Sequence, residues 1–400
     1  MLNQKKNCAN QISQYYCVEI IVIFARVFLK RFMIEQVHTP FPSPSKPTFK
    51  FIDLFAGIGG FRIALQQLGG KCVFSSEWDA AAQDTYFKNY GETPFGDITD
   101  SKIQSQIPDN FDVLCGGFPC QPFSICGKKK GFEDTRGTLF FEICQILAKH
   151  KPQCCFLENV QHLTKHDKGN TFKVIVESLN NLGYNVSYKV LNAKDFGLPQ
   201  FRERIFIVAT RKGIFNFEKI KKQEPVRLES FLDLDNKEFE YLSDSEYTLL
   251  DPQLIKSQPK SGLVFCGYRN KGIWKKGIRP NTLHLSRCHR QPNRIYSVCG
   301  THPTIPSQET SGRFFIYLPN EKKVRKLTIN ECYRIMGFPD TFIKHPSLAS
   351  QYKQIGNSVA IPVIKAIAKA IIEQNLLTQT THQNGRNYIR NNNSQLVINF

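Results

Sequence analysis

The sequence predicts an α/β protein with a mostly parallel sheet and a second, smaller domain. Three observations support this fold class. Residues 49–55 form a short apolar run that passes through a glycine-rich turn into a helical pattern. Later apolar runs end in carboxylates, as strands often do at the carboxyl edge of an open α/β sheet. A long basic segment, 252–296, then interrupts this pattern and indicates the second domain.

The composition excludes several classes of protein. The chain has 400 residues, of which 41% are hydrophobic and 22% are charged, as in a soluble protein with a sizeable core. Its 13 cysteines include no Cys-x-x-Cys pair, which argues against a disulfide scaffold or a zinc ribbon, and we expect no metal site. We see no convincing secretory signal and therefore expect reduced thiols in a cytoplasmic protein.

Positive charge is clustered along the chain. The net charge is +19, and residues 252–296 hold ten Lys or Arg side chains and no acid, whereas residues 228–251 hold eight acids and one Lys. Aromatic residues such as Tyr268 and Trp274 lie among the basic ones. This pattern predicts a nucleic-acid contact surface, either for DNA or for RNA. The alternative is a solvated loop that is basic by chance.

The two ends of the chain lie outside the predicted domains. The apolar run 16–32 is interrupted by charged residues, among them Glu19 and Arg26, and is too short to span a membrane. We expect residues 1–48 to be a poorly ordered extension, or the product of an upstream start with Met33 as the working start. Residues 377–400 are rich in Asn, Gln and Thr and predict a flexible tail.

The first strand and its glycine turn predict a ligand site. Gly57 and Gly59 let the backbone turn tightly and approach a ligand closely. Two further apolar runs close with a carboxylate, one at Glu77 and one at Gly96-Asp97-Ile98, and we interpret both as strand ends. An acid about twenty residues after the glycines suits ribose hydroxyls. Together these strand ends predict an adenosine pocket.

Details of this pocket favour a cofactor without a pyrophosphate. Trp78 and Ile98 are expected to cover the two faces of a purine ring, and Asp97 to accept from its exocyclic amine. The turn lacks the third glycine of a dinucleotide site, and no basic residue of the Walker type follows it. S-adenosylmethionine fits these features, and it would deliver a methyl group.

A cysteine follows the next predicted strand in an unusual setting. Residues 112–117 run into Pro119-Cys120-Gln121-Pro122, so two prolines hold Cys120 on a stiff turn at the same sheet edge. Residues 125–137 are rich in Gly and Lys. We interpret them as a mobile loop that closes over a phosphate backbone.

Four more candidate residues converge on this edge. Glu158 and Asn159 end the apolar run 154–157, and Arg202 and Arg204 come directly before the run 205–208. Each of these residues alone is more often structural. Their joint occurrence with a cysteine at one sheet edge favours a catalytic site.

Six blocks of the chain resemble, in order, the DNA (cytosine-5) methyltransferases of bacterial restriction-modification systems. The blocks are 55–60, 119–124, 158–160, 200–204, 325–339 and 354–359. The resemblance implies a Rossmann-like class I S-adenosylmethionine-dependent methyltransferase fold with a smaller DNA target-recognition domain. It implies a catalytic domain at 49–227, a target-recognition domain at 228–325, a hinge with a late motif at 326–353 and a returning catalytic segment at 354–376.

The resemblance also implies a chemistry for each catalytic residue. A Cys120 thiolate adds to cytosine C6 and makes C5 a nucleophile for the methyl group. Glu158, when protonated, binds N3, and Arg204 binds O2. Asn159 would position the glutamate or the exocyclic amine, and Arg202 would hold a turn or a neighbouring backbone group. No residue stands out as the base that removes the C5 proton.

The same resemblance implies the residues that bind cofactor and DNA. The cofactor residues are Phe55, Gly57, Gly59, Glu77, Trp78, Asp97, Ile98, Pro119, Leu139, Asn357, Ser358 and Val359. The target cytosine must flip out of the duplex, because a stacked base cannot be reached. The residues expected at the DNA are Ser124, Lys128, Arg136, Gln291, Arg294 and Thr304.

Two other functions stay open at this point. A cytosine-5 methyltransferase that acts on transfer RNA would use nearly the same blocks, although the long basic domain favours duplex DNA. The other is a DNA-binding protein built on an inactive methyltransferase, but Cys120, Glu158 and Arg204 are all present. We expect a monomer that binds double-stranded DNA and is functionally linked to a cognate restriction endonuclease.

Overall fold

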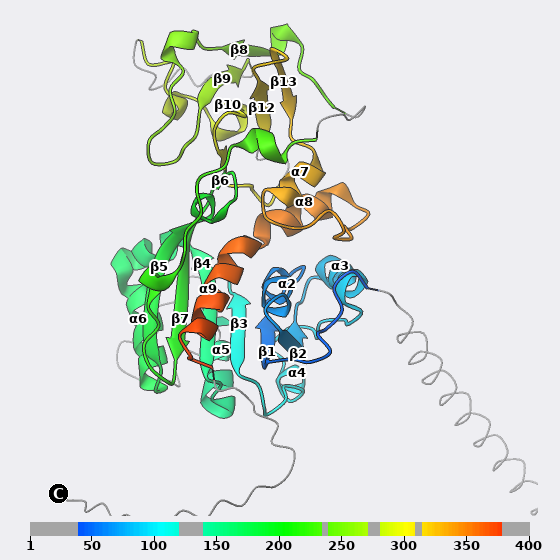
Figure 1. The fold of residues 1–400 in the computed structure, drawn as a ribbon, viewed down its shortest axis with the longest axis vertical. Coiled ribbons are helices and arrows are strands. Elements are labelled where there is room, and N and C mark those ends of the chain that lie inside the picture. Colours follow the sequence, from blue (N-terminus) through cyan, green and yellow to red (C-terminus); the bar gives the residue numbers. More distant parts are fainter. Residues whose placement is uncertain (1–38, 120–138, 234–238, 271–280, 309–313, 378–400) are drawn as a thin grey trace, which may run out of the picture.

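The chain folds into two lobes, one at each end of its long axis (Figure 1). The computed structural model describes residues 39–119, 139–233, 239–270, 281–308 and 314–377. A six-stranded sheet forms the centre of the larger lobe and a five-stranded sheet the centre of the smaller one. Helices α7 (Ile329–Arg334) and α8 (Leu348–Asn357) lie between the two sheets (Figure 1). The predicted α/β fold with a second, smaller domain is therefore confirmed.

The large sheet is mostly parallel. In spatial order its strands are β2 (Gly70–Ser76), β1 (Phe49–Leu54), β3 (Val113–Gly117), β4 (Cys154–Val160), β7 (Glu203–Thr210) and β5 (Asn185–Asn192). The first four run parallel, whereas β7 is antiparallel to both of its neighbours. Because β7 enters the sheet in reverse, its first residues lie beside the last residues of β4, and Arg204 pairs with Val160.

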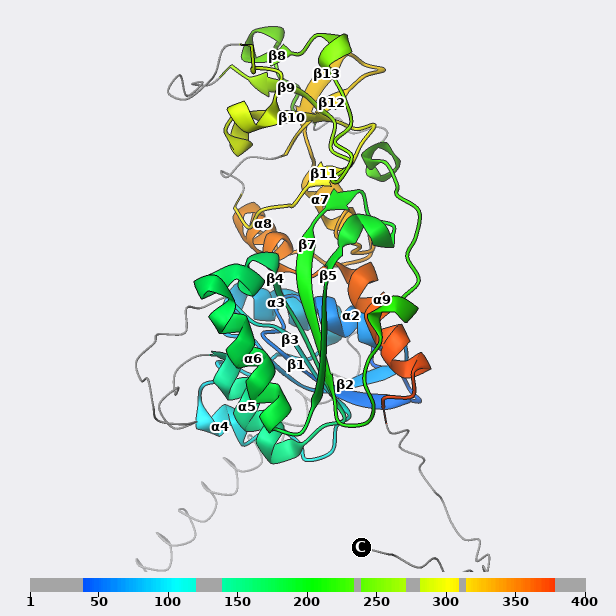
Figure 2. The ribbon, with the colours of Figure 1, turned by 90° about the vertical axis from the view of Figure 1, so that its left-hand side faces the viewer.

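Helices cover both faces of this sheet, which explains why its strands are near-continuous apolar runs. Helices α2 (Gly60–Gln66) and α9 (Ile361–Glu373) lie on one face, and α5 (Leu139–His150) and α6 (Asn170–Asn181) on the other (Figure 2). Buried α9 residues such as Ile364, Ile367 and Ile371 recur at the spacing of one helical face. The remaining helices are α3 (Ala80–Tyr90) and the short α4 (Ser101–Gln104).

One segment of the described chain, Leu348–Glu373, is long and apolar enough to cross a membrane by length and composition alone. It consists of α8 and α9, and residues 358–360 separate the two helices. Within its most apolar window 61% is buried inside the protein, and Ile364 and Ile367 are fully buried. The segment is therefore a pair of helices that packs in the core.

The small lobe is built on a sheet of its own. In spatial order its strands are β13 (Lys323–Lys326), β12 (Phe315–Leu318), β10 (Arg294–Ser297), β9 (Phe265–Arg269) and β8 (Tyr247–Leu249). A small core containing Cys266, Ile295 and Val324 stabilises one face of this sheet. The basic segment 252–296 supplies β9 and the start of β10, and residues 271–280 of that segment lie outside the described residues.

Short 3-10 helices connect these elements. They are η1 (Gln161–Gly169), η2 (Ala193–Phe196), η3 (Phe217–Lys219), η4 (Leu228–Phe231), η5 (Asp244–Glu246), η6 (Pro252–Leu254), η7 (Ser286–Cys288) and η8 (Gln291–Asn293). Half of them, η5 to η8, lie in the small lobe, where they connect its short strands.

A two-stranded sheet joins the lobes. Strand β6 (Gln200–Phe201) pairs in parallel with β11 (His302–Pro303). The buried Gln200 side chain extends this contact, because its Nε2 donates to the carbonyl of Ile335 at 2.9 Å and its Oε1 accepts from the N–H of Ile305 at 3.1 Å. These bonds hold the small lobe against the start of β7.

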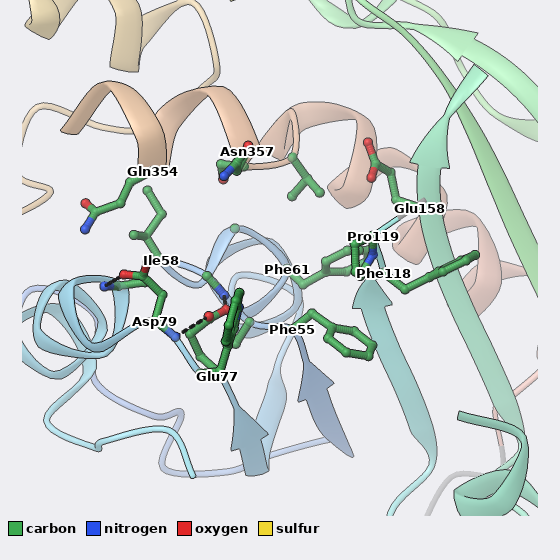
Figure 3. Close-up of a pocket in the computed structure, with 18 of the residues that line it drawn as sticks. Phe55, Ile58, Phe61, Glu77, Asp79, Phe118, Pro119, Glu158, Gln354 and Asn357 are labelled. Atoms are coloured by element: carbon green, nitrogen blue, oxygen red, sulfur yellow. Dashed lines mark hydrogen bonds between the residues drawn. The ribbon is translucent and has the colours of Figure 1, made fainter. Parts of the chain in front are cut away.

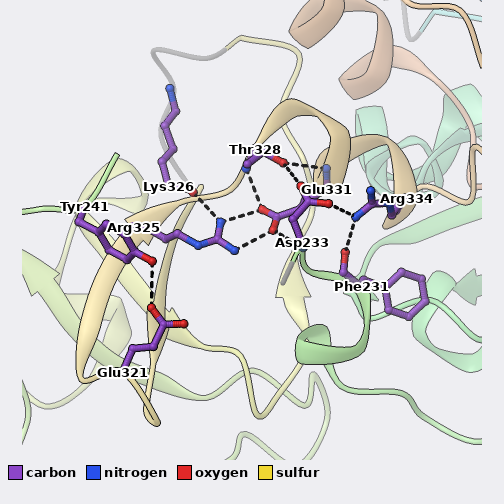
Figure 4. A network of polar contacts seen from close by, with 9 residues as sticks. All are labelled: Phe231, Asp233, Tyr241, Glu321, Arg325, Lys326, Thr328, Glu331 and Arg334. Carbon is purple, nitrogen blue, oxygen red and sulfur yellow. Dashed lines mark hydrogen bonds and ion pairs between the residues drawn. The ribbon is translucent and has the colours of Figure 1, made fainter. Parts of the chain in front are cut away.

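A buried polar network stabilises the turn between β13 and α7 (Figure 4). The two terminal nitrogens of Arg325 donate to the two carboxylate oxygens of Glu331, at 2.8 and 2.7 Å. The same carboxylate accepts the N–H of Thr328 at 2.8 Å, in a capping box that starts α7, and the N–H of Asp233 at 2.9 Å. Arg334 donates to Asp233 at 2.6 Å. The network therefore ties the small sheet to the helices between the lobes.

The prediction of a strand end at Gly96-Asp97-Ile98 is wrong. In the structure Phe95 forms an isolated parallel bridge with Ser76 beside the edge strand β2, and no strand is assigned to the residues after it. The flanking residues explain this: Pro94 has no N–H to donate, and Gly96 is a poor strand former. Asp97 and Ile98 are therefore loop residues, although they still reach the edge of the sheet.

Candidate active site

A pocket of about 700 Å³ lies at the carboxyl ends of β1, β2, β3 and β4 (Figure 3). Its lining includes every predicted cofactor residue except Gly59: Phe55, Gly57, Glu77, Trp78, Asp97, Ile98, Pro119, Leu139, Asn357, Ser358 and Val359. The predicted catalytic residues Glu158, Asn159, Arg202 and Arg204 line the same pocket. The structure thus brings both sets together, for those members that lie among the described residues.

The glycine turn positions Glu77. Gly57 has a φ of +54°, and its N–H donates to Glu77 Oε2 at 2.8 Å. The N–H of Asp79 donates to the other oxygen, Oε1, at 2.8 Å. Burial raises the pKa of Glu77, and these two N–H donors oppose that rise. Each oxygen keeps a lone pair with which it can accept a hydrogen bond from a ligand.

Gly59 does not line the pocket but packs against Tyr90 of α3. Its φ is +82°, and a Cβ at this position would lie 2.4 Å from the ring of Tyr90, so only glycine fits. The Tyr90 hydroxyl donates to the carbonyl of Gly59 at 2.8 Å. Gly59 therefore allows the start of α2 to pack against α3.

Next to the glycine turn, the pocket wall offers an exposed aromatic ring. Trp78 is 80% exposed, which is unusual for such a large side chain, whereas Ile98 is buried. Asp97 is exposed and accepts the N–H of Thr99 at 3.0 Å through Oδ1. This part of the pocket can therefore stack on a planar ligand and accept hydrogen bonds at its edge.

Glu158 and Arg204 form an ion pair in the same pocket. Arg204 Nε lies 3.1 Å from Glu158 Oε1, and their side chains are only 16% and 11% exposed. Their proximity follows from the reversed direction of β7, which places Arg204 beside the end of β4. Burial raises the pKa of Glu158, and the charges of Arg204 and Arg202 oppose this rise. The carboxyl can therefore be protonated closer to neutral pH than an ordinary glutamate.

Asn159 and Arg202 bind backbone carbonyls. Asn159 Nδ2 donates to the carbonyl of Phe118 at 2.9 Å, so it fixes the chain at the end of β3 instead of contacting Glu158. Arg202 is buried, and its Nη2 donates to the carbonyls of Ser358 at 2.7 Å and Gly356 at 3.2 Å. These contacts agree with the prediction that Arg202 holds a neighbouring backbone group.

Four predicted residues, Cys120, Ser124, Lys128 and Arg136, lie outside the described residues. The described chain stops at Pro119 and resumes at Leu139, and both of these residues line the pocket. Within the described ranges, no group of His, Cys, Asp and Glu side chains could hold a metal ion.

The predicted DNA residues of the small lobe lie away from the pocket lining. Gln291 is exposed at the start of η8. Arg294 is half-buried, and its Nε donates to the carbonyl of His289 at 2.9 Å. Thr304 donates through its hydroxyl to the carbonyl of Phe201 at 2.8 Å, at the junction of the lobes. Contact between these residues and DNA stays a prediction.

Five polar residues of the pocket wall were not predicted as site residues: Ser76, Asp79, Thr99, Lys353 and Gln354. Lys353 forms an ion pair with Asp79, and Gln354 Nε2 donates to the carbonyl of Ala81 at 2.9 Å. Both contacts tie α8 to the start of α3. Asp79 could have been found as the N-cap of α3, but the partner residues lie more than 270 positions further along the chain. No local pattern reveals such a pair.

Comparisons with known sequences identify the family of the chain. Residues 49–373 match the family model described as C-5 cytosine-specific DNA methylase. Type II methyltransferase M.HpaII of Haemophilus parainfluenzae is 44% identical over 335 residues, which cover 82% of this chain and 90% of the relative. Type II methyltransferase M.HhaI of Haemophilus parahaemolyticus is 43% identical over 328 residues, which cover 80% of this chain and 93% of the relative.

Solved structures share the fold. The Dnmt2 methyltransferase of S. pombe matches with a TM-score of 0.56 and 18% identity, over 82% of this chain and 99% of that one. The Entamoeba histolytica methyltransferase EhMeth matches with a TM-score of 0.56 and 20% identity, over 82% of this chain and 98% of that one. Since the family model spans both lobes and the sequence relatives are matched over most of their length, the chain belongs to the C-5 cytosine-specific DNA methylases.

Proposed function

We propose that this chain transfers a methyl group from S-adenosylmethionine to C5 of a flipped-out cytosine in duplex DNA, through a transient bond between Cys120 and cytosine C6. One observation carries the proposal: the Glu158–Arg204 ion pair lies in the same pocket as Glu77 and the glycine turn. The pocket therefore offers one part that suits a nucleoside and another that suits a pyrimidine. The identity of 43–44% to M.HpaII and M.HhaI, which are both Type II methyltransferases, supports this assignment.

The residues of the pocket fit the cofactor. Glu77 has free lone pairs for ribose hydroxyls, and Trp78 exposes its ring for a purine. A buried carboxylate on the Gly57 N–H occupies the place where a phosphate would bind, which disfavours phosphorylated cofactors. A volume of about 700 Å³ is typical of small-molecule sites. When bound, S-adenosylmethionine supplies an electrophilic methyl group.

The chain's own residues would activate the cytosine. Glu158 in its acid form donates to N3 while the Cys120 thiolate adds to C6, so the charge that arrives on the ring is offset. Arg204 binds O2. After C5 has been methylated, loss of the C5 proton to a base returns the electron pair that expels the thiolate and restores Cys120. By holding Phe118, Asn159 fixes the strand end that leads to the cysteine.

We propose that target recognition and catalysis are carried out by different lobes. We assign the target-recognition domain to 228–325, the hinge to 326–353 and the catalytic domain to 49–227 with 354–376, and we place the duplex between the two domains. Exposed basic residues such as Lys256 and Arg287 would neutralise phosphates. We further propose a cytoplasmic monomer that protects host DNA from a cognate restriction endonuclease.

A covalent trap tests the chemistry. Bisulfite sequencing of a host that expresses the chain first identifies the methylated site. The purified protein is then incubated with S-adenosylmethionine and a duplex that carries 5-fluorocytosine at that site. Fluorine blocks the final elimination, so we expect an adduct that survives denaturing electrophoresis. Cys120→Ser should form none, and an adduct with transfer RNA but not with duplex DNA would overturn the proposed substrate.

Salt should weaken DNA binding steeply. If about six phosphates are neutralised, raising NaCl from about 50 to about 200 mM should lower the affinity about 10³-fold through counterion release. Fluorescence anisotropy of a labelled duplex measures this slope. Arg287→Gln should reduce the slope by about one, whereas Lys173→Gln, on the outer face of α6, should leave it unchanged. A response to salt that is nearly flat would contradict a phosphate-binding surface.

A further inference from the structure

Arg202 lies where three segments of the chain meet. It stands between β6 and β7, and its side chain is 3% exposed. Its Nη2 donates to the carbonyls of Ser358 at 2.7 Å and Gly356 at 3.2 Å, and its Nη1 lies 3.5 Å from the carbonyl of Ile305. Gly356 lies in the last turn of α8 and Ser358 directly follows this helix, and we call residues 356–358, which line the cofactor pocket, the pocket turn. The third acceptor, Ile305, follows β11 in the small lobe.

The pocket turn, residues 356–358 at the end of α8, is packed tightly on both sides. A Cβ on Gly356 would lie 2.3 Å from the carbonyl oxygen of Pro306, so the turn touches the small lobe directly. A Cβ on Gly60, at the start of α2, would lie 2.9 Å from Ser358 Oγ and 2.7 Å from Val359 Cγ2. The turn therefore separates the glycine turn of the pocket from the small lobe by one layer of backbone.

Strand β6 holds the same part of the small lobe from the other side. Gln200 accepts the N–H of Ile305 at 3.1 Å, and Thr304 donates to the carbonyl of Phe201 at 2.8 Å. Residues 302–305 thus contact both β6 and, through the carbonyl of Ile305, the Arg202 guanidinium. Any shift of the small lobe relative to the pocket must change the bond of Arg202 to Ile305 or its bonds to the turn.

We propose that Arg202 couples cofactor binding to DNA binding, because its guanidinium joins the pocket turn 356–358 to Ile305 of the small lobe. This inference rests on the proposed function, since it takes S-adenosylmethionine for the pocket and DNA for the small lobe. A ligand that orders the turn favours one position of Ile305, and DNA that fixes the small lobe favours one conformation of the turn. Coupling of this kind is reciprocal.

Arg204 provides a matched control. It is another arginine of the same pocket, with a half-buried side chain, but its Nε pairs with Glu158 and its Nη1 donates to the carbonyl of Glu203. No hydrogen bond between Arg204 and Ile305 or the turn is found among the described residues. Arg204 should therefore matter for the reaction and not for the coupling.

Binding measurements with the non-reactive product, S-adenosylhomocysteine, test the proposal. Anisotropy of a duplex with the target site is titrated with protein, with and without saturating S-adenosylhomocysteine. In the wild type we expect DNA affinity to rise about tenfold, and saturating DNA to raise S-adenosylhomocysteine affinity by the same factor. Arg202→Gln should bring both factors close to one while each ligand alone still binds. Arg204→Gln should keep both factors and lose methyl transfer.

Coupling that is unchanged in Arg202→Gln would overturn the proposal, as would its absence from the wild type. A merely structural role would lower the Tm and weaken both ligands while the coupling factor stays constant. If Arg202→Gln does not fold, Arg202→Lys serves instead: it keeps the charge but loses the fork of donors. Arg202→Lys should show a smaller coupling factor than the wild type. A coupling factor equal to that of the wild type would also overturn the proposal. If the covalent adduct with 5-fluorocytosine DNA forms but cofactor and DNA binding are not coupled, the proposed function stands and only the role of Arg202 fails.

Discussion

Replacing Glu158 by glutamine should lower the rate of methyl transfer about 10²- to 10⁴-fold, the range for loss of a general acid. Glutamine keeps the shape of the side chain and can still donate an N–H, but it cannot release a proton to the ring. In the structure the carboxyl is buried and pairs with Arg204 at 3.1 Å. The charge of Arg202 also acts on it. Single-turnover incorporation of labelled methyl groups into target DNA measures the loss.

The same carboxyl should shape the pH profile. Because burial raises the pKa of Glu158 against the charges of Arg204 and Arg202, its acid form persists to a higher pH than that of an ordinary glutamate. Cys120 reacts as the thiolate, which becomes more abundant as pH rises. A bell-shaped profile of kcat/KM results. Its alkaline limb reports the loss of the Glu158 proton and should be missing in Glu158→Gln.

A remote carboxylate serves as the control for this prediction. Glu177 on α6 is exposed and pairs with Lys173 one helical turn away, outside the pocket lining. Glu177→Gln should keep both the rate and the bell shape. Wild-type activity in Glu158→Gln would show that the carboxyl does not take part in the reaction.

Glu331→Ala should lower the free energy of unfolding by about 3–5 kcal/mol, the cost of leaving a buried charge without its partner. The Glu331 and Arg325 side chains are 0% and 1% exposed, so water cannot replace the lost carboxylate. The N–H groups of Thr328 and Asp233 lose their acceptor at the same time. Urea unfolding followed by circular dichroism measures the change.

Two further variants sharpen this stability experiment. Glu321→Ala removes an exposed carboxylate that accepts from the Tyr241 hydroxyl at 2.9 Å, and it should change stability by less than about 0.5 kcal/mol. Exchanging both buried partners, Arg325→Met with Glu331→Leu, should recover most of the loss because no charge is then desolvated. A cost for Glu331→Ala as small as that for Glu321→Ala would show that the pair is not needed for stability.

Local patterns predicted much of the large lobe. The strands β1, β3 and β4 are apolar runs that end in turns, and the residues after them reach one edge of the sheet, so the pocket could be predicted from their spacing. The same reasoning failed at Asp97, where proline and glycine allow only an isolated bridge. Convergence of Glu158 and Arg204 was also predicted, but the antiparallel entry of β7 that causes it was not.

The junction between the lobes could not be predicted in this way. Arg202 donates to carbonyls that lie 103 to 156 positions away, and β6 and β11 are strands of two residues each. Such contacts leave no periodicity in the sequence, because backbone carbonyls are the same for every residue type. The charge of the basic segment predicted that a second domain exists, but the domain's short strands carry too few residues to show an alternating pattern.

The position of α9 has a consequence for the newly made protein. This helix packs beside α2, although one is made near the start of synthesis and the other near the end (Figure 2). While the ribosome is still adding the small lobe, Gly60 lacks the neighbours Ser358 and Val359, which line the pocket. We therefore expect a nascent or prematurely terminated chain to bind the proposed methyl donor more weakly than the full chain, because the wall of the pocket at residues 356–359 is synthesised last.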